Sequence, residues 1–440
     1  MFSRPLLPLV AFALLLSPAL RAQTGSTGAI SGTVRDQSQG VVPGAAVRVT
    51  NADTAETREA LTDERGNYAV GVLNPGRYRV EISMNGFKTV VHESVTVRVT
   101  ETSVLNDTLA IASQPSETVT VSAESEILQT GTTAMGRVVD SETITALPLA
   151  TRNFTQLTAL SPGTSAGLRD TLVVGNGSQN VYSNGGTQMS NSYSINGVGA
   201  MNAVSSSAVI DFAFTGIAVP SVDSIQEFKV QTSMYDAAFG QRAGANISIV
   251  TRSGTSDFHG TAYEFFRNDA LNANSFFFNS VGSPRPVLKQ NQFGGALGGP
   301  IRKERTFFFL SYEGTRQRNG ASLDSTRTLV LPPIPQDRSA ASVGAAFAGQ
   351  TGTRGGLAID AAGTNINPVA LKLLQFKLPD GSYLIPSPQK SGPGTNYAIS
   401  IPAGYQQDQF NVNVDHQIAA KNRLSAKWFF STAVTTPGLF

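Results

Sequence analysis

The sequence predicts a mainly β fold divided into several domains, and three observations lead to this prediction. Short segments throughout the chain alternate apolar and polar residues, the period-two pattern of β-strands. Glycine is abundant, with 42 of 440 residues, and only 15% of residues are charged, which is typical of turn-rich β structure. The 24 Phe and 10 Tyr are too many for a chain that never packs a core. This length allows two to four domains.

The first 22 residues have the three parts of a secretory signal peptide. Arg4 supplies the positive charge, residues 6–16 form an apolar core, and a candidate cleavage site follows Ala22. The apolar core is too short for a spanning helix, which needs about 20 residues. We therefore expect export, with a mature chain that begins near Gln23. No later stretch reaches 18 consecutive apolar residues, so we expect any membrane span to be a β-strand.

The charge balance and the lack of cysteine exclude several classes of function. Lys and Arg number 33 and Asp and Glu number 31, which gives a formal net charge of +2. A nucleic-acid-binding protein would need a basic surface to neutralise phosphates, so we expect no nucleic-acid partner. With no cysteine, the chain has no thiolate nucleophile and no thiolate zinc ligand.

Residues 27–112 are predicted to form a small β-sandwich. Alternating segments lie at 29–35, 46–50 and 78–82, and turns lie at 63–67 and 74–76. Gly66 is free to take the positive φ that the first turn requires. Four motifs follow in order, G-x-V-x-D from Gly32, P-G-A-x-V from Pro43, T-D-x-x-G-x-Y from Thr62 and L-x-P-G-x-Y from Leu73. This order resembles the carboxypeptidase regulatory-like domain, which implies a transthyretin-like sandwich with a carbohydrate-binding-like fold.

Residues 113–125 are predicted to be a linker that contains a short alternating strand. The strand consists of Glu117, Thr118, Val119, Thr120 and Val121. It has two possible roles, either one more edge strand or a strand donated to the sheet of a partner. The segment resembles the TonB box of TonB-dependent receptors, an acidic residue followed by Thr and apolar residues ahead of a plug. This resemblance implies that these five residues bind TonB.

Residues 126–252 resemble the mixed α/β plug domain of a TonB-dependent outer-membrane receptor. The motifs that carry the resemblance are L-P-L-A-T-R-N-F at 147–154, S-P-G at 161–163, S-Y-S-I-N-G at 192–197, V-D-S-I-Q-E-F-K-V at 222–230 and a closing motif from Tyr235 to Asn246. In the closing motif Ala245 replaces a frequent Gly. The tightest resemblance is to the Oar-like group, whose members also carry the N-terminal sandwich. A second soluble β domain is the alternative.

Residues 255–440 are predicted to begin a transmembrane β-barrel that faces outer-membrane lipid. The residues expected to share a face within each strand are Thr261, Tyr263 and Phe265; Phe308, Leu310 and Tyr312; Phe410, Val412 and Val414; and Leu424, Ala426, Trp428 and Phe430. Apolar-out and polar-in alternation over about 10 residues is the pattern of a lipid-facing barrel strand. A soluble sheet with one solvated face shows the same alternation, but the aromatic content favours lipid.

The predicted strands are connected by one short and one long link. Residues 419–422 are short enough for a periplasmic turn, and the polar stretch from Glu313 to Gln406 is expected to be a long outer loop. Only about five strands can be counted, which is fewer than a closed membrane barrel needs. We therefore expect the barrel to be truncated and the sequence to be a fragment of a longer receptor.

Several motifs could carry chemistry, and each has a simpler structural explanation. Gly163–Gly167 matches G-x-S-x-G, but Ser161 and Pro162 before it predict a turn rather than the strand and helix of a nucleophile elbow. Gly294–Gly299 lacks the Lys-Ser/Thr of a phosphate-binding loop, and crowding between barrel wall and plug explains its glycines. The three histidines, His92, His259 and His416, lack metal-ligand spacing. We therefore expect no catalytic residue, no cofactor and no metal.

The resemblance to TonB-dependent receptors implies the leading hypothesis for function. Such a receptor takes up an extracellular ligand, here an unidentified one for which a glycan is a candidate, with energy supplied by TonB. It would lie in the outer membrane with its N-terminal sandwich in the periplasm. The main alternative is a cell-surface β-sandwich adhesin or carbohydrate-binding protein without transport. An enzyme is a distant third hypothesis.

Overall fold

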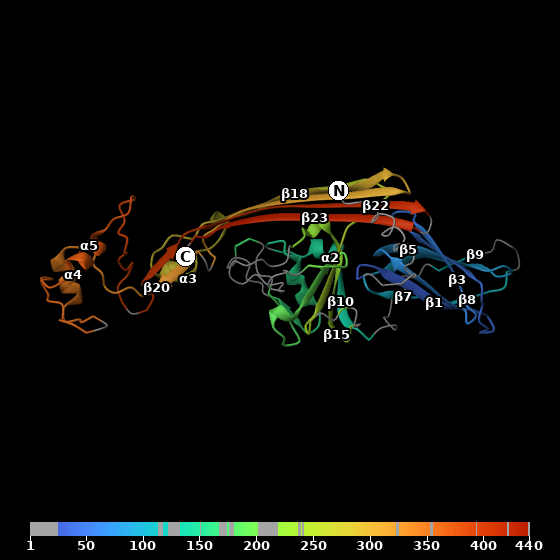
Figure 1. Ribbon diagram of the computed structural model, residues 1–440, viewed down its shortest axis with the longest axis horizontal. Helices are drawn as coiled ribbons and strands as arrows, with labels where there is room; N and C mark the ends of the chain where they lie inside the picture. The colour runs from blue at the N-terminus through green and yellow to red at the C-terminus, as the bar shows by residue number, and fades with distance from the viewer. Residues whose placement is uncertain are drawn as a thin grey trace, which may run out of the picture.

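The computed structural model has an elongated, mainly β architecture, as the sequence predicts. It describes residues 25–112, 118–121, 133–149, 151–166, 174–175, 180–200, 219–235, 239, 242–322, 325–352, 355–392, 394–419 and 422–438. The signal segment 1–22 lies outside this range. Long strands run along one side of the molecule, a sandwich lies at one end, and a central domain lies against the long strands (Figure 1).

The sandwich consists of two sheets. Its strands are β1 (Gly28–Asp36), β2 (Ala46–Asn51), β3 (Thr57–Leu61), β4 (Asn67–Leu73), β5 (Gly76–Ser83), β6 (Thr89–Val97), β7 (Thr102–Val104), β8 (Asp107–Leu109) and β9 (Thr118–Val121). One sheet has the order β4-β1-β7, with β8 also pairing with β1, and the other has the order β3-β2-β5-β6-β9. Strand β9 is therefore the last strand of the five-stranded sheet.

Alternation along the strands builds the core of the sandwich, as the sequence predicts. Val80 and Ile82 of β5 are fully buried and lie opposite the equally buried Val49 and Val47 of β2. The turn at 63–67 forms as expected, because the Asp63 carboxylate accepts hydrogen bonds from two backbone N–H groups of the turn, at 2.9 and 2.8 Å. Gly66 takes a φ of 73° there.

The central domain, residues 133–252, is built on a five-stranded sheet with the order β10-β15-β16-β13-β14. Its elements are β10 (Met135–Asp140), α2 (Ser141–Ala146), η1 (Phe154–Leu160), β11 (Thr164–Ala166), β12 (Val181–Ser183), η2 (Gln188–Ser190), β13 (Ser192–Ile195), β14 (Val198–Gly199), η3 (Val222–Ser224), β15 (Ile225–Ser233) and β16 (Asn246–Thr251). The Phe154 and Phe228 rings, with centroids 5.4 Å apart, lie in its core beside Ile247 and Ile249.

The third part is a sheet of long antiparallel strands with the order β17-β18-β19-β22-β23, here called the long-strand sheet. Its strands and flanking elements are β17 (His259–Asn268), η5 (Asp269–Leu271), α3 (Phe276–Ser280), β18 (Leu288–Arg302), β19 (Thr306–Asn319), β22 (Ala403–Ala419) and β23 (Asn422–Thr436). Among the residues that the structure describes, no helix has the length and apolar character to cross a membrane.

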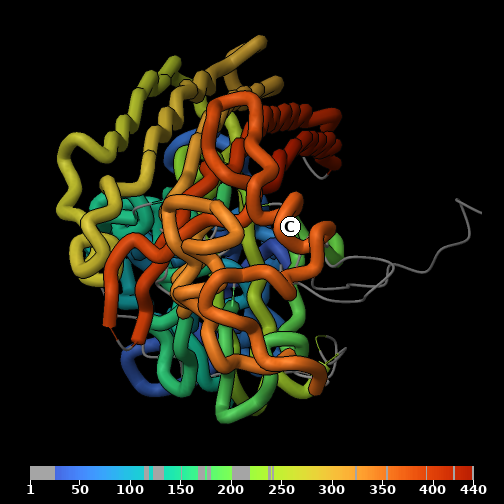
Figure 2. The backbone as a smooth tube through the Cα atoms, turned by 90° about the vertical axis from the view of Figure 1, so that its left-hand side faces the viewer, coloured from blue at the N-terminus to red at the C-terminus, as the bar shows by residue number. Residues whose placement is uncertain are grey.

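The long loop between β19 and β22 is shorter than the sequence predicts. Residues 313–319 pair with residues 403–409, so the loop spans 320–402 rather than 313–406. The prediction is wrong at these strand ends because few of their side chains are apolar on either face. The period-two alternation of apolar and polar residues is therefore not visible in the sequence there. The loop carries β20 (Thr326–Leu329), α4 (Ala340–Phe347), α5 (Pro368–Gln375) and β21 (Tyr397–Ser400). It extends beyond the end of the long strands opposite the sandwich, toward the viewer in Figure 2.

The two faces of the long-strand sheet differ in polarity. On the outer face Phe410 and Trp428 are exposed, and the rings of Tyr312 and Phe410 lie 4.9 Å apart across β19 and β22. On the inner face most of the buried side chains are polar, beside the buried rings of Phe307 and Phe309. The polar ones include Gln290, Gln292, Thr315, Gln317, Gln409, Asn411, Asn413 and Asp415. The predicted alternation is therefore present in β19 and β22.

Strand β17 departs from the predicted orientation. Thr261, Tyr263 and Phe265 share a face, but this face points inward. Tyr263 donates a hydrogen bond to Glu313 of the inner face at 2.9 Å. The guanidinium group of Arg152, from the central domain, lies 4.7 Å from the centroid of the Tyr263 ring and 4.1 Å from that of Phe265. A period-two pattern defines two faces but does not say which one meets the central domain.

Candidate functional site

The segment predicted to bind a partner lies at the edge of the sandwich. Thr118–Val121 form β9, which pairs in parallel with β6, and Thr89 to His92 lie opposite its four residues in order. Glu117 lies outside the described residues. The structure thus realises the edge-strand interpretation for these four residues. Because β9 is the terminal strand of its sheet, its other edge is not used by a described strand.

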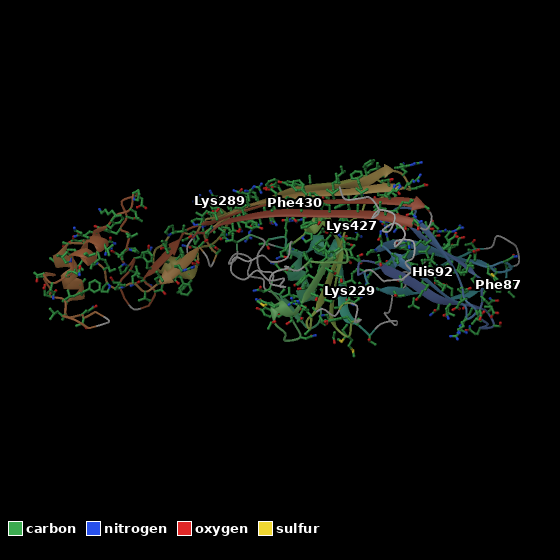
Figure 3. The ribbon with its side chains drawn as sticks, in the orientation of Figure 1. Phe87, His92, Lys229, Lys289, Lys427 and Phe430 are labelled. Carbon is green, nitrogen blue, oxygen red and sulfur yellow. The ribbon has the colours of Figure 1, made fainter. Side chains whose placement is uncertain are left out.

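Strand β9 is attached to the sandwich by packing as well as by pairing. Val121 packs against the core of the sandwich, whereas Val119 is 43% exposed. Opposite Val121, His92 lies 2.8 Å from the carboxylate of Asp107, which links β6 to β8 of the other sheet. The edge of the sheet that carries β9 is therefore connected to the other sheet through the contact between His92 and Asp107 (Figure 3 labels His92).

Two charged groups of the central domain dock the sandwich. Lys229 of β15 forms an ion pair with Glu101 at 3.1 Å, and the side chains are 2% and 8% exposed. Glu227, two residues before Lys229 and on the same face of β15, accepts a hydrogen bond from the backbone N–H of Val99. Val99 and Glu101 belong to the turn that follows β6, so this turn is held directly against β15. Figure 3 shows Lys229 on the central domain.

Burial perturbs one of these groups strongly. Loss of hydration raises the pKa of Glu227 to about 7, because an ionised carboxylate is poorly solvated at the interface. The nearby carboxylate of Glu101 also raises this pKa, whereas the Val99 hydrogen bond and the charges of Arg98 and Lys229 lower it. The docking interface therefore contains a carboxyl group that titrates near neutral pH.

A second set of contacts joins the sandwich to the long-strand sheet. Arg423 of β23 forms ion pairs at 2.9 Å with Glu56 of the β2–β3 turn and with Asp415 of β22. The backbone N–H of Ser256 donates to the carbonyl of Asp53 at 2.9 Å. A cavity of about 60 Å³ lies at this junction and is lined by residues of all three parts. The sandwich thus contacts both of its neighbours.

The central domain meets the long-strand sheet mainly through polar groups. Arg152 pairs with Asp223 of its own domain and lies 3.6 Å from the Glu313 carboxylate of β19. Gln292 donates to the carbonyl of Thr151 at 3.1 Å, and Asn413 donates to the carbonyl of Arg252 at 2.6 Å. Water can replace such hydrogen bonds, so this interface can separate at lower cost than an apolar core.

The motifs considered for catalysis and metal binding lie apart. Thr164–Ala166 of the G-x-S-x-G match form β11, which pairs with β12, and Gly167 lies outside the described residues. The three histidines lie on β6, β17 and β22. His416 contacts Thr306 at 2.8 Å, and His259 contacts Thr255 at 3.2 Å. Within the described ranges, no three His, Asp or Glu side chains gather as metal ligands would.

The glycines of β18 lie close to aromatic side chains. A Cβ at Gly299 would lie 2.4 Å from the Phe258 ring, and a Cβ at Gly294 would lie 2.8 Å from the Tyr263 hydroxyl. These glycines therefore leave room for the ring of Phe258, just before β17, and for the ring of Tyr263 in β17.

Sequence reasoning missed the charged residues that join the domains. Arg152, Glu227 and Lys229 enter the sequence argument only as parts of motifs. A usable signal is present in β15, because Glu227 and Lys229 are two residues apart and so lie on one face of a strand that otherwise packs in a core. Two opposite charges on the buried side of a strand indicate a polar docking partner.

Comparison with known proteins agrees with this organisation. Residues 29–110 match the carboxypeptidase regulatory-like domain, and residues 250–440 match the outer membrane beta barrel domain. The TonB-dependent transporter Oar of Myxococcus xanthus is 29% identical over 338 residues, which cover 72% of this chain and 30% of that protein. The chain thus spans less than a third of the length of this relative.

Two solved receptors also resemble the chain. The siderophore receptor PirA from Acinetobacter baumannii matches 72% of this chain and 34% of its own, with 13% identity and a TM-score of 0.39. The ferric enterobactin receptor PfeA from Pseudomonas aeruginosa matches 70% of this chain and 34% of its own, with 11% identity and a TM-score of 0.37. The relative Oar is a transporter rather than an enzyme. The chain is therefore similar to the TonB-dependent transporter Oar, and it carries a match to the carboxypeptidase regulatory-like domain ahead of a match to the outer membrane beta barrel domain.

Proposed function

We propose that this protein takes up an extracellular ligand across the outer membrane with energy delivered by TonB. In this proposal the central domain is the plug and the long-strand sheet is part of the barrel wall. The observation that carries the proposal is the position of β9, a terminal strand with an available edge, directly ahead of a domain that rests on the polar inner face of an amphipathic sheet.

The proposed contact for TonB is the segment Glu117, Thr118, Val119, Thr120 and Val121. An extended segment at a sheet edge binds a partner strand mainly through backbone hydrogen bonds, and its side chains add selectivity. The exposed side chains of Thr118, Val119 and Thr120 leave room for such a partner.

We propose that the sandwich lies in the periplasm and that residues 320–402 lie outside the cell. The sandwich lies at the end of the long strands where Ala419 pairs with Asn422, and the loop between β19 and β22 lies at the opposite end (Figure 1). Barrels of the outer membrane have short periplasmic turns and longer outer loops. The ligand, for which a glycan is one candidate, would then approach from the side of residues 320–402.

Replacing Val119 by Pro tests the TonB contact. Proline removes a backbone donor and fixes φ, so it should weaken pairing with a partner strand. We expect the affinity for the purified periplasmic part of TonB to fall about tenfold or more, since each lost backbone hydrogen bond contributes about 1 kcal/mol. Val119→Ala, which keeps the backbone intact, should weaken binding only modestly. Binding is measured with the purified protein in detergent.

Leu61→Pro is the matched control for general damage to the sheet. Leu61 is exposed at the end of β3, the strand at the opposite edge of the same sheet. It should leave TonB binding unchanged. If Val119→Pro binds TonB as well as the unaltered protein, this segment is not the contact. If both proline variants lose binding equally, the segment has only a structural role.

A further inference from the structure

We infer that the sandwich is itself part of the docking surface for TonB. A TonB strand would add to the outer edge of β9 while β9 stays paired with β6, so that the partner extends the five-stranded sheet of the sandwich. This inference rests on the proposed TonB contact and goes beyond it. It gives the N-terminal sandwich a function in energy coupling rather than in ligand binding.

The pairing geometry leaves β9 available while it remains attached. In a β-strand, successive residues direct their backbone N–H and C=O groups to opposite edges. Thr118–Val121 use one edge for the parallel pairing with β6. Every second residue of β9 directs its backbone N–H and C=O groups toward β6. The residues between them direct theirs to the other edge of β9, which is the outermost edge of the sheet among the described strands. A partner strand can therefore pair without displacing any observed contact.

Attachment to β6 should favour binding of the partner. Fixing one backbone residue in an extended conformation costs about 1–2 kcal/mol of conformational entropy, so a free four-residue segment would have to be ordered at the moment of binding. Strand β9 is already ordered by β6 and by the packing of Val121 against the core. If β9 left β6, it would lose this pairing and the packing of Val121, and the freed segment would have to be ordered again when it binds TonB. The geometry therefore favours addition to the attached strand over its release.

The attached strand also has a short structural connection to the central domain. Strand β9 pairs with β6, and β6 ends at Val97, two residues before Val99. The turn that follows is bound to Glu227 and Lys229 of β15 through Val99 and Glu101. Strand β15 lies inside the central sheet, between β10 and β16. A force applied by TonB at β9 would reach β15 through the sandwich, in addition to the covalent path along the chain.

A reversible cross-link between β9 and β6 tests the inference. Thr89 and Thr118 lie directly opposite each other. Such neighbours lie within the Cα separation that a disulfide bridges, about 4.4–6.8 Å. Because the protein has no cysteine of its own, the double variant Thr89→Cys/Thr118→Cys forms only this intramolecular bridge. The oxidised form holds β9 on β6, and the reduced form of the same molecule is the matched control.

We expect the oxidised and reduced forms to bind the purified periplasmic part of TonB with affinities within about twofold of each other. A loss of about tenfold or more on oxidation, recovered on reduction, would show that β9 must leave β6 and would overturn the inference. The single variants Thr89→Cys and Thr118→Cys show whether either substitution alone alters binding.

Hydrogen exchange of the unaltered protein provides a second test that needs no variant. If TonB adds to attached β9, the backbone amides of β6 should exchange no faster when TonB is bound. Faster exchange in β6 on TonB binding would mean that β9 has been withdrawn, which contradicts the inference. The proposed TonB contact fails separately, through an unchanged affinity of Val119→Pro. If Val119→Pro weakens TonB binding and the oxidised cross-link also abolishes it, the proposed TonB contact stands and only the inference is overturned.

Discussion

Lys229 of the central domain and Glu101 of the sandwich form an ion pair of 3.1 Å whose side chains are only 2% and 8% exposed. Removing two charges from water is costly, and their attraction offsets this cost only when the geometry is good. A buried pair of this kind therefore adds little net stability but strongly penalises wrong arrangements. It sets how the sandwich sits on β15.

Replacing Lys229 by Met should weaken docking of the sandwich. The change leaves Glu101 buried without its cation, and breaking one side of a buried ion pair costs about 3–5 kcal/mol. We expect faster hydrogen exchange in residues 98–101 of the purified protein. The double variant Lys229→Met/Glu101→Leu removes both charges and should recover most of the protection. If the double variant exchanges as fast as the single one, the ion pair does not determine docking.

Docking of the sandwich should weaken as pH rises from about 4.5 to about 7. The pKa of Glu227 is raised from 4.5 to about 7 by burial, so the docked protein holds a proton that the separated domains release in this range. The stabilisation of docking by this proton is complete below pH 4.5, decreases between pH 4.5 and about 7, and is lost above pH 7. Exchange in residues 98–101, corrected for the intrinsic effect of pH, measures it.

Glu227→Gln is the control for this pH dependence. Glutamine keeps a side-chain oxygen that can accept the Val99 hydrogen bond but does not titrate. Its docking should not change between pH 4.5 and 7. A pH dependence that persists in Glu227→Gln would assign the effect to another group at the interface.

Arg152→Ala should loosen the central domain from the long-strand sheet. It removes the partner of Glu313 and the cation that lies over the rings of Tyr263 and Phe265. A cysteine at Thr315, which is fully buried on the inner face, reports this change by its rate of maleimide labelling. With a cost of about 3–5 kcal/mol, we expect labelling to be about 100-fold faster or more.

Arg152→Lys separates charge from geometry at this contact. Lysine keeps the positive charge but lacks the planar guanidinium that can lie over the rings and contact two carboxylates. Its labelling rate should lie between those of the unaltered protein and Arg152→Ala. A rate in Arg152→Ala equal to that of the unaltered protein would mean that Arg152 does not hold the central domain.

The proposed orientation in the membrane predicts which residues are accessible from outside the cell. Leu357, in the loop 320–402, is 87% exposed, and Leu61, on the sandwich, is 68% exposed. Leu357→Cys should react with a membrane-impermeant maleimide on intact cells. Leu61→Cys should react only after the outer membrane is permeabilised. The reverse pattern would invert the orientation, and labelling of both residues on intact cells would place the sandwich at the cell surface.

Local patterns were sufficient to predict the sandwich and the alternating long strands. Burial of every second residue is a property of one strand, so Val80 and Ile82 could be assigned to a core without knowledge of their neighbours. The turn at Asp63 and Gly66 was predictable for the same reason, because its hydrogen bonds and its positive φ involve only adjacent residues.

Local patterns were insufficient wherever the outcome depends on which surfaces meet. The strand at Thr118–Val121 is compatible with any sheet edge, and the availability of an edge on β6 decided where it pairs. Tyr263 points inward, where its ring contacts Arg152, a residue more than 100 positions earlier in the chain.

The sequence alone determined the β class of the protein, the order of its parts and the motifs that link it to TonB-dependent receptors. The tertiary structure decided where the sandwich docks, which face of β17 points inward, and that Thr118–Val121 lie on β6. The physical reason is that strand formation depends on nearest neighbours along the chain. Buried ion pairs and sheet edges depend on groups that are far apart in the sequence and meet only after the domains have formed.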